Sequence, residues 1–189
     1  MSDSARQKWD ARYRDREPGP SSAPGWLAEI EREIPANGLA LDIAAGAGRG
    51  ALWLARRGLE VVAADISPVG LAIAQEAAAE EGLDLRTEVI DFEEDALPGG
   101  PFDVVTCFNY RQRSLFPVIA DALAPAGVVV VELPTVQNLE RNAHPSKRWL
   151  AEDNELLSDV SNLAALRVIY YREGWFDDRH VARLVAQKR

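Results

Sequence analysis

The sequence predicts an α/β fold in which a doubly wound, mostly parallel sheet is covered by helices on both faces. From residue 39 onward, apolar runs of strand length alternate with segments of helical spacing. Near-continuous apolar strands separated by helices are typical of a parallel sheet that is buried on both sides. The last two strand-like runs, 164–171 and 180–187, are joined by a short loop that contains Gly174. A parallel crossover needs about a dozen residues, so these two runs predict an antiparallel hairpin.

The chain divides into an N-terminal segment, residues 1–25, and one domain, residues 26–189. A short helix is predicted over residues 2–17, because aromatic and basic side chains recur there at three- and four-residue steps. The residues at these steps are Trp9, Arg12, Tyr13 and Arg16. A run rich in Pro, Gly and Ser, 18–25, follows and predicts a flexible or turn-rich hinge.

The domain begins with a predicted helix that carries Trp26, Ile30 and Ile34 on one face and ends at Pro35. The expected parallel strands are 39–44, 60–66, 83–90, 102–108 and 127–133. The expected helices between them are 51–57, 68–81 and 114–123. Ser67 suits the N-cap of the second of these helices, since the Pro that follows it is favoured at the first helical position.

Composition narrows the classes of function. Lys plus Arg total 21 and Asp plus Glu total 30, so the formal net charge is −9, which argues against binding to nucleic acid or to an anionic membrane. The single cysteine, Cys107, excludes an internal disulfide, and with only two histidines it argues against a zinc site. The chain has neither a signal-peptide core nor an apolar run of the ~18 residues that a membrane span needs. We therefore expect a cytoplasmic protein without a metal centre.

The strongest local pattern is a glycine-rich turn between the first predicted strand and the helix after it. Its sequence is LDIAAGAGRG, residues 41–50. Gly46 and Gly48 allow a tight turn and let a ligand approach the backbone. One interpretation is the dinucleotide fingerprint of a nicotinamide-dependent oxidoreductase, with Asp65 about 20 residues further on to bind a ribose hydroxyl. Another interpretation is a purely structural turn that binds no ligand.

A third interpretation explains three acids at the ends of successive strands. Asp42, before the glycines, can accept hydrogen bonds from a cationic amino group or from its bridging waters. Asp65 can hold both hydroxyls of a ribose, and Asp91 can accept from the exocyclic amine of adenine. Ile66 and Phe92 lie beside these acids and offer apolar surface to a flat base. Ligands of doubly wound sheets bind beyond the carboxyl ends of the strands, where these residues are expected to meet.

This set of residues resembles the class I S-adenosylmethionine-dependent methyltransferases over residues 39–187. The resemblance implies a Rossmann-like sheet of seven strands in the order 3-2-1-4-5-7-6, with strand 7 antiparallel, and S-adenosyl-L-methionine as the cofactor. The chain departs from the pattern at Ala44, where many members have glycine. The cofactor-binding residues that the resemblance implies are Trp9, Arg12, Tyr13, Asp42, Ala44, Gly46, Gly48, Asp65, Ile66, Asp91, Phe92 and Phe108.

The N-terminal segment narrows the resemblance. The sequence WDARY, residues 9–13, is similar to the W-x-x-R-Y segment of small-molecule methyltransferases of the tellurite-resistance and thiopurine type. In that group the segment folds over the cofactor, which implies that residues 1–25 are a lid and its hinge. Ordinary packing of Trp9 and Tyr13 on one helix face is the alternative.

The methyl acceptor is expected to be a small molecule, such as an oxyanion, a thiol or a carboxylate. Asn109 is not followed by the Pro-Pro-Tyr of the enzymes that methylate amines of DNA. Instead, basic residues follow strands four and five: Arg111, Arg113, Arg141, His144, Lys147 and Arg148. The planar fork of Arg suits such anions, although pairing with surface acids is the alternative.

The residues assigned to catalysis are Tyr110, Arg111 and His144, with His144 as the candidate proton acceptor. The expected function is methyl transfer to such an acceptor by a monomer or a homodimer. A non-catalytic domain that only binds S-adenosylmethionine is the remaining alternative.

Overall fold

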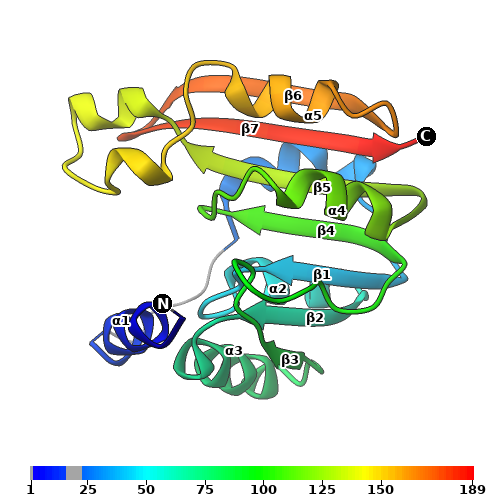
Figure 1. Cartoon of the computed structure of the whole chain (residues 1–189). Helices are drawn as coiled ribbons and strands as arrows, with labels where there is room; N and C mark the ends of the chain where they lie inside the picture. Colours follow the sequence, from blue (N-terminus) through cyan, green and yellow to red (C-terminus); the bar gives the residue numbers. More distant parts are fainter. Residues whose placement is uncertain (1, 16–22) are drawn as a thin grey trace.

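The computed structural model describes residues 2–15 and 23–189. Within these residues, seven strands form one sheet in the order β3-β2-β1-β4-β5-β7-β6 (Figure 1). The strands are β1 (Leu39–Ile43), β2 (Glu60–Asp65), β3 (Arg86–Val89), β4 (Phe102–Phe108), β5 (Leu123–Pro134), β6 (Leu166–Phe176) and β7 (Arg179–Lys188). The first five run parallel to one another, and β7 pairs antiparallel with both β5 and β6. The strand order and the antiparallel seventh strand confirm the prediction.

The C-terminal hairpin is longer than the sequence predicts. Gly174, expected in the connecting loop, pairs with Val181 inside the ladder. The turn consists of Asp177 and Asp178 instead, and Asp177 takes a left-handed conformation with φ 56°. A glycine in a strand-like run is typical of a turn in sequence, but cross-strand pairs such as Trp175 and His180 continue the ladder beyond it.

Helices cover both faces of the sheet. One face packs against η1 (Gly25–Glu33), α2 (Arg49–Arg56) and α3 (Pro68–Glu80), and the other packs against α4 (Leu115–Ala122) and α5 (Glu155–Ser161) (Figure 1). Two short 3₁₀ helices, η2 (Val136–Glu140) and η3 (Lys147–Trp149), lie between β5 and α5. Apolar side chains therefore bury both sheet surfaces, as near-continuous apolar strands require.

One predicted helix has a different geometry in the structure, and one helix was not predicted. The segment from Trp26 is a 3₁₀ helix rather than an α-helix; Trp26, Leu27 and Ile30 are all buried, and their spacing fits either geometry. Helix α5 was not expected. Helix α1 (Ser2–Arg14) forms where a helix was predicted, while Arg16 and most of the hinge lie outside the described residues.

The predicted N-cap of α3 is confirmed. The hydroxyl of Ser67 accepts a hydrogen bond from the backbone N–H of Gly70 at 3.1 Å, and Pro68 begins the helix. This start places α3 directly after β2, so the end of that strand and its carboxylate lie beside the helix N-terminus.

Candidate functional site

The glycine turn has the backbone geometry that its sequence predicts. Ala44, Gly46 and Gly48 all have positive φ, of 54°, 53° and 84°. At Gly48 a Cβ would lie 2.6 Å from the Cβ of Ala74, so a glycine is needed for α2 to pack against α3. Ala44 accommodates the left-handed conformation at the position where many members of the similar family have glycine. The turn therefore directs the chain from β1 into α2.

Asp65 ends β2 and is tied to the glycine turn. Its Oδ2 accepts a hydrogen bond from the backbone N–H of Gly46 at 2.8 Å, and its Oδ1 accepts one from the N–H of Ser67 at 2.8 Å. The side chain is buried, and burial raises the pKa of Asp65, while these two N–H donors oppose the shift. The two donors fix the carboxylate in one orientation at the carboxyl edge of the sheet.

Asp42 is the second buried carboxylate beside the turn. The hydroxyl of Thr106, on the neighbouring strand β4, donates to its Oδ1 at 2.6 Å. Its Oδ2 has no hydrogen-bond partner among the described residues. Burial raises the pKa of Asp42 to about 7, while the hydroxyl of Thr106 and the backbone N–H of Ala51 at the start of α2 oppose this shift. Because an unpaired buried oxygen is costly, this atom marks a position where a ligand donor would be stabilising.

Helix α1 lies against the glycine turn. Asp10 is buried, and its Oδ1 accepts a hydrogen bond from the Ser67 hydroxyl at 2.5 Å. A Cβ built on Gly46 would lie 2.2 Å from the hydroxyl oxygen of Tyr13, and one on Gly70 would lie 2.9 Å from its ring. The Tyr13 side chain therefore packs directly on the backbone of the turn.

The other two residues of the N-terminal pattern lie further out. The ring of Trp9 stacks on Tyr13 with centroids 6.0 Å apart, and the guanidinium of Arg12 lies 5.1 Å from the centroid of Trp9. Trp9 is exposed to 36%. The structure thus brings Tyr13 to the turn, while Trp9 and Arg12 extend the stack toward solvent.

The residues predicted to contact the adenine ring lie near the ends of β2, β3 and β4. Ile66 is half-buried after β2. Asp91, two residues beyond β3, accepts a hydrogen bond from the N–H of Glu93 at 3.0 Å. Phe92 is buried and packs on Tyr110, with ring centroids 6.0 Å apart. Phe108 ends β4 and contacts the ring of Trp26, on the face of the sheet that η1 covers, whereas Phe92 and Tyr110 lie on the other face.

The three residues assigned to catalysis are not gathered into one site. The hydroxyl of Tyr110 donates to Gln112 at 2.7 Å, and burial raises the pKa of Tyr110. Arg111 is buried and forms an ion pair with Glu155 of α5, which also pairs with Arg113. Burial raises the pKa of Glu155, but hydrogen bonds, including those from both arginines, outweigh this effect and lower it. His144 is exposed in the loop after η2.

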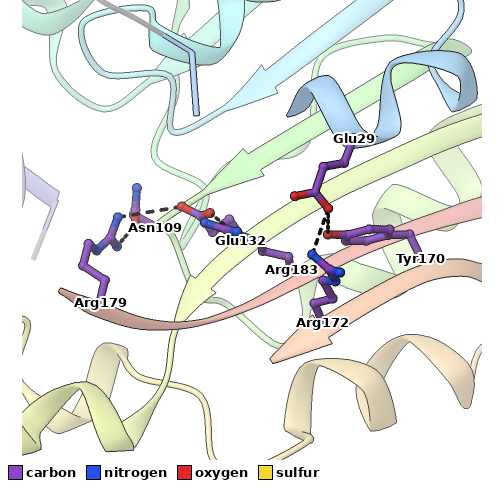
Figure 2. A network of polar contacts seen from close by, with 7 residues as sticks. All are labelled: Glu29, Asn109, Glu132, Tyr170, Arg172, Arg179 and Arg183. Carbon is purple, nitrogen blue, oxygen red and sulfur yellow. Dashed lines mark hydrogen bonds and ion pairs between the residues drawn. The ribbon is translucent and has the colours of Figure 1, made fainter. Parts of the chain in front are cut away.

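A group of charged residues that sequence reasoning missed lies at the same edge of the sheet. Glu132, near the end of β5, is 3% exposed and pairs with Arg183 of β7, whose Nε donates to Oε2 at 2.8 Å. Arg179 lies 3.7 Å from the other oxygen of Glu132 and donates to Asn109 at 2.6 Å (Figure 2). The sequence contains a sign of this group, because Glu132 is the single charged residue in the apolar run 127–133 and a charge inside a buried strand needs a partner.

Three further findings concern the described part of the chain. In residues 2–15 and 23–189, no three His, Cys, Asp or Glu side chains are grouped so that they could hold a metal ion. No helix in this part of the chain has the length and apolar character to cross a membrane. Cys107 is buried, and burial raises the pKa of its thiol to about 12.

Comparison of the sequence with known proteins identifies a methyltransferase domain. Residues 40–127 match the family described as "Methyltransferase domain". A demethylmenaquinone methyltransferase from Thermus thermophilus is 40% identical over 102 residues, which are 50% of this chain and 46% of the relative. The chain thus spans about half of the length of this curated relative. These matches set aside the nicotinamide-dependent oxidoreductase.

Solved structures share the fold at low sequence identity. A structure described as "Conversion of a Disulfide Bond into a Thioacetal Group during Echinomycin Biosynthesis" has a TM-score of 0.72 at 19% identity and covers 97% of this chain and 92% of that one. TehB from Haemophilus influenzae has a TM-score of 0.70 at 17% identity, over 86% of this chain and 61% of its own. A methyltransferase from Clostridium acetobutylicum has a TM-score of 0.69 at 13% identity, over 98% of both chains. The sequence matches show a methyltransferase domain in residues 40–127, and the shared strand order shows that the sheet has the class I S-adenosylmethionine-dependent methyltransferase fold.

Proposed function

We propose that the protein transfers the methyl group of S-adenosyl-L-methionine to a small acceptor molecule. The observation that carries this proposal is the pair of buried carboxylates, Asp42 and Asp65, on either side of the glycine turn. Asp42 keeps one oxygen without a donor, and the ammonium group of the cofactor is a donor of opposite charge, reaching it directly or through a water. The residues present therefore fit this cofactor.

The chain's own residues contribute binding and orientation. The carboxylate of Asp65, held by the N–H groups of Gly46 and Ser67, accepts hydrogen bonds from the ribose hydroxyls without having to reorient. Gly46 carries no side chain, which leaves room for Tyr13 of α1 to pack directly on the turn. Asp91, Ile66 and Phe92 remain the candidates for the adenine ring, on the side of the site nearest β3.

When bound, the cofactor supplies a methyl group on a positively charged sulfur; the C–S bond breaks with its electron pair left on sulfur, and a lone pair of the acceptor forms the new bond. The protein's part in such a displacement is to align the acceptor and to exclude water. An acceptor that arrives protonated also needs a base. His144 stays a prediction for this role, and its exposed position does not favour it over solvent.

Residues 1–25 are proposed to act as a lid over the cofactor. Support comes from α1, whose Asp10 and Tyr13 contact Ser67 and the glycine turn across a long separation in sequence. Few apolar side chains hold α1 in place, so bound cofactor would add contacts that order it further. Hydrogen exchange in residues 5–14 should slow when S-adenosylhomocysteine binds, and unchanged exchange would remove the lid from the proposal.

Ligand-dependent melting and a methyl-transfer assay test the proposed function. A hundredfold excess of S-adenosylhomocysteine over its Kd stabilises the fold by ~2.7 kcal/mol, which raises the Tm of a domain of this size by roughly 5–10 °C. NAD at the same concentration should leave the Tm unchanged. Labelled methyl should then pass from S-adenosylmethionine to members of a panel of oxyanions, thiols and carboxylates. Stabilisation without transfer to any member would favour the non-catalytic binding domain, and stabilisation by NAD alone would refute the proposal.

A further inference from the structure

A cavity of about 240 Å³ lies at the carboxyl edge of the sheet, between Gly25, the start of α2 and the β6–β7 hairpin. The residues that line it include Gly25, Arg49, Glu132, Phe176, Arg179 and Arg183. Arg49 is the residue that begins α2 directly after the glycine turn. The cavity therefore adjoins the turn that the proposed cofactor would occupy. Its volume is below the ~300–1,000 Å³ typical of pockets for drug-sized ligands.

The alternation of side chains along the strands places the cavity on the same face as the cofactor's carboxylates. In the register of the sheet, Asp42 pairs with Thr106, two residues before Phe108 on β4. Phe108 pairs with Glu132, and Glu132 with Arg183. Residues two apart on a strand, and residues paired across strands, point to the same face. Glu132 and Arg183 thus share the face of Asp42, while Arg111 pairs with Glu155 on α5, a helix of the other face.

The floor of the cavity carries two guanidinium groups and one carboxylate. Glu132 pairs with both Arg179 and Arg183, so these three residues carry one positive charge in excess, and the exposed Arg49, Asp177 and Asp178 bring the charge of the whole lining to zero. Arg183 is largely buried, and its guanidinium lies 3.8 Å from the centroid of Phe176 and 5.4 Å from that of Trp26. The Arg179 side chain is 37% exposed, and among residues 2–15 and 23–189 its polar contacts are one of 3.7 Å to Glu132 and one hydrogen bond to Asn109. A guanidinium has five N–H donors, so Arg179 retains donors for a ligand.

We propose that this cavity is the methyl-acceptor site and that it takes a small molecule with a flat apolar part and an anionic group bound by Arg179. The inference rests on the proposed methyl transfer and replaces Arg111, which the sequence suggested, with a cation on the cofactor's face. Phe176 supplies the apolar wall. Glu132 and Asn109 contact the Arg179 guanidinium and hold it in place (Figure 2). Two acids on the hairpin turn, Asp177 and Asp178, also line the cavity but are exposed at its rim, where water screens their charge.

The test compares three probes of one ring size on protein saturated with S-adenosylhomocysteine. Benzoate, benzamide and benzylamine present a negative, a neutral and a positive group, and ligand-observed NMR titration gives the affinity of each. Benzoate should bind at least tenfold more tightly than the other two. Equal binding of the three, preference for benzylamine, or no binding of benzoate would overturn the inference.

Matched variants of the hairpin locate the binding. Arg179→Gln should weaken benzoate at least tenfold, Arg179→Lys should restore part of the loss, and S-adenosylhomocysteine affinity should not change in either. Arg172→Gln is the control, because Arg172 is an exposed arginine of the same hairpin that pairs with Glu29 and does not line the cavity. An equal loss in both Gln variants, or no loss in either, would overturn the inference. Failure of the unaltered protein to bind S-adenosylhomocysteine would instead refute the proposed function.

Discussion

Asp42 and Asp65 differ in how their carboxyl groups are satisfied, although both are buried at the end of a strand. Asp65 accepts two backbone N–H bonds, whereas Asp42 accepts a hydroxyl bond from Thr106 and leaves Oδ2 unpartnered. Burial raises the pKa of both groups, and that of Asp42 to about 7. Asp42 therefore changes its charge near neutral pH in the protein without ligand.

Affinity for S-adenosylhomocysteine should fall as the pH drops below about 7. Because the pKa of Asp42 is raised from 3.8 to about 7, the ligand-free protein is most stable with Asp42 protonated and loses this stability as the pH rises through about 7. A cationic amino group binds the carboxylate, so each pH unit below the pKa should cost up to about tenfold in affinity. Calorimetry from about pH 5 to about pH 8 measures this slope. Asp42→Asn should flatten it, and an Asn variant with the slope of the unaltered protein would exclude Asp42.

Site residues that follow from a local pattern were predictable, and those that depend on distant partners were not. Gly46 and Asp65 lie in one βα unit, and the predicted strand ends place them together. The contact between Glu132 and Arg183 joins residues 51 apart in sequence and depends on the register between β5 and β7. Arg111 lies beyond the end of β4. The alternation of side chains between the two faces holds only within a strand, so it does not predict the face on which Arg111 lies. Its partner Glu155 lies on α5, which the sequence did not predict.

Helix α1 is the element that links the N-terminal segment to the glycine turn. It contacts the domain through a buried hydrogen bond between Asp10 and Ser67 and through the ring of Tyr13. The close approach of Tyr13 to the turn depends on the missing side chain of Gly46. The turn and the helix are therefore expected to respond together to a substitution at this position.

Gly46→Ala should loosen α1. The new Cβ would lie 2.2 Å from the Tyr13 hydroxyl oxygen, so the helix must shift. Amide exchange in residues 5–14 should rise at least tenfold, and affinity for S-adenosylhomocysteine should fall. Gly82→Ala is the control, since Gly82 also has positive φ, of 69°, but has no atom within 4 Å of the added Cβ; it should cost about 1 kcal/mol of stability without altering exchange in α1. Equal exchange in the two variants would mean that Tyr13 does not hold the helix in place.

At the level of elements, the sequence predicted the strands better than the segments between them. Apolar runs identify β1, β2 and β4 within a residue or two, because strands buried on both faces tolerate few polar side chains. Spacing alone could not separate a 3₁₀ helix from an α-helix at Trp26. Gly174 suggested a turn that cross-strand pairing moves to Asp177.

The whole sheet sorts the charges of the site by strand order. Asp42 and Asp65 end β1 and β2, while Glu132, Arg179 and Arg183 belong to β5 and β7 on the other side of β4 (Figure 1). The negative groups thus face the part of the site proposed for the ammonium and ribose of the cofactor. The cationic groups face the cavity proposed for an anionic acceptor, which a protein of net charge −9 would otherwise repel.

The binding of S-adenosylhomocysteine to Asp65→Ala, measured by calorimetry, tests most directly whether the carboxyl edge of this sheet is a cofactor site. A charged hydrogen bond contributes ~1.5–3 kcal/mol, so the affinity should fall about tenfold to a hundredfold while circular dichroism shows a folded sheet. Asp84→Ala, which removes an exposed acid after α3, should bind as the unaltered protein does. An Asp65→Ala protein that is folded and binds S-adenosylhomocysteine with unchanged affinity would contradict the assignment of this edge to the cofactor.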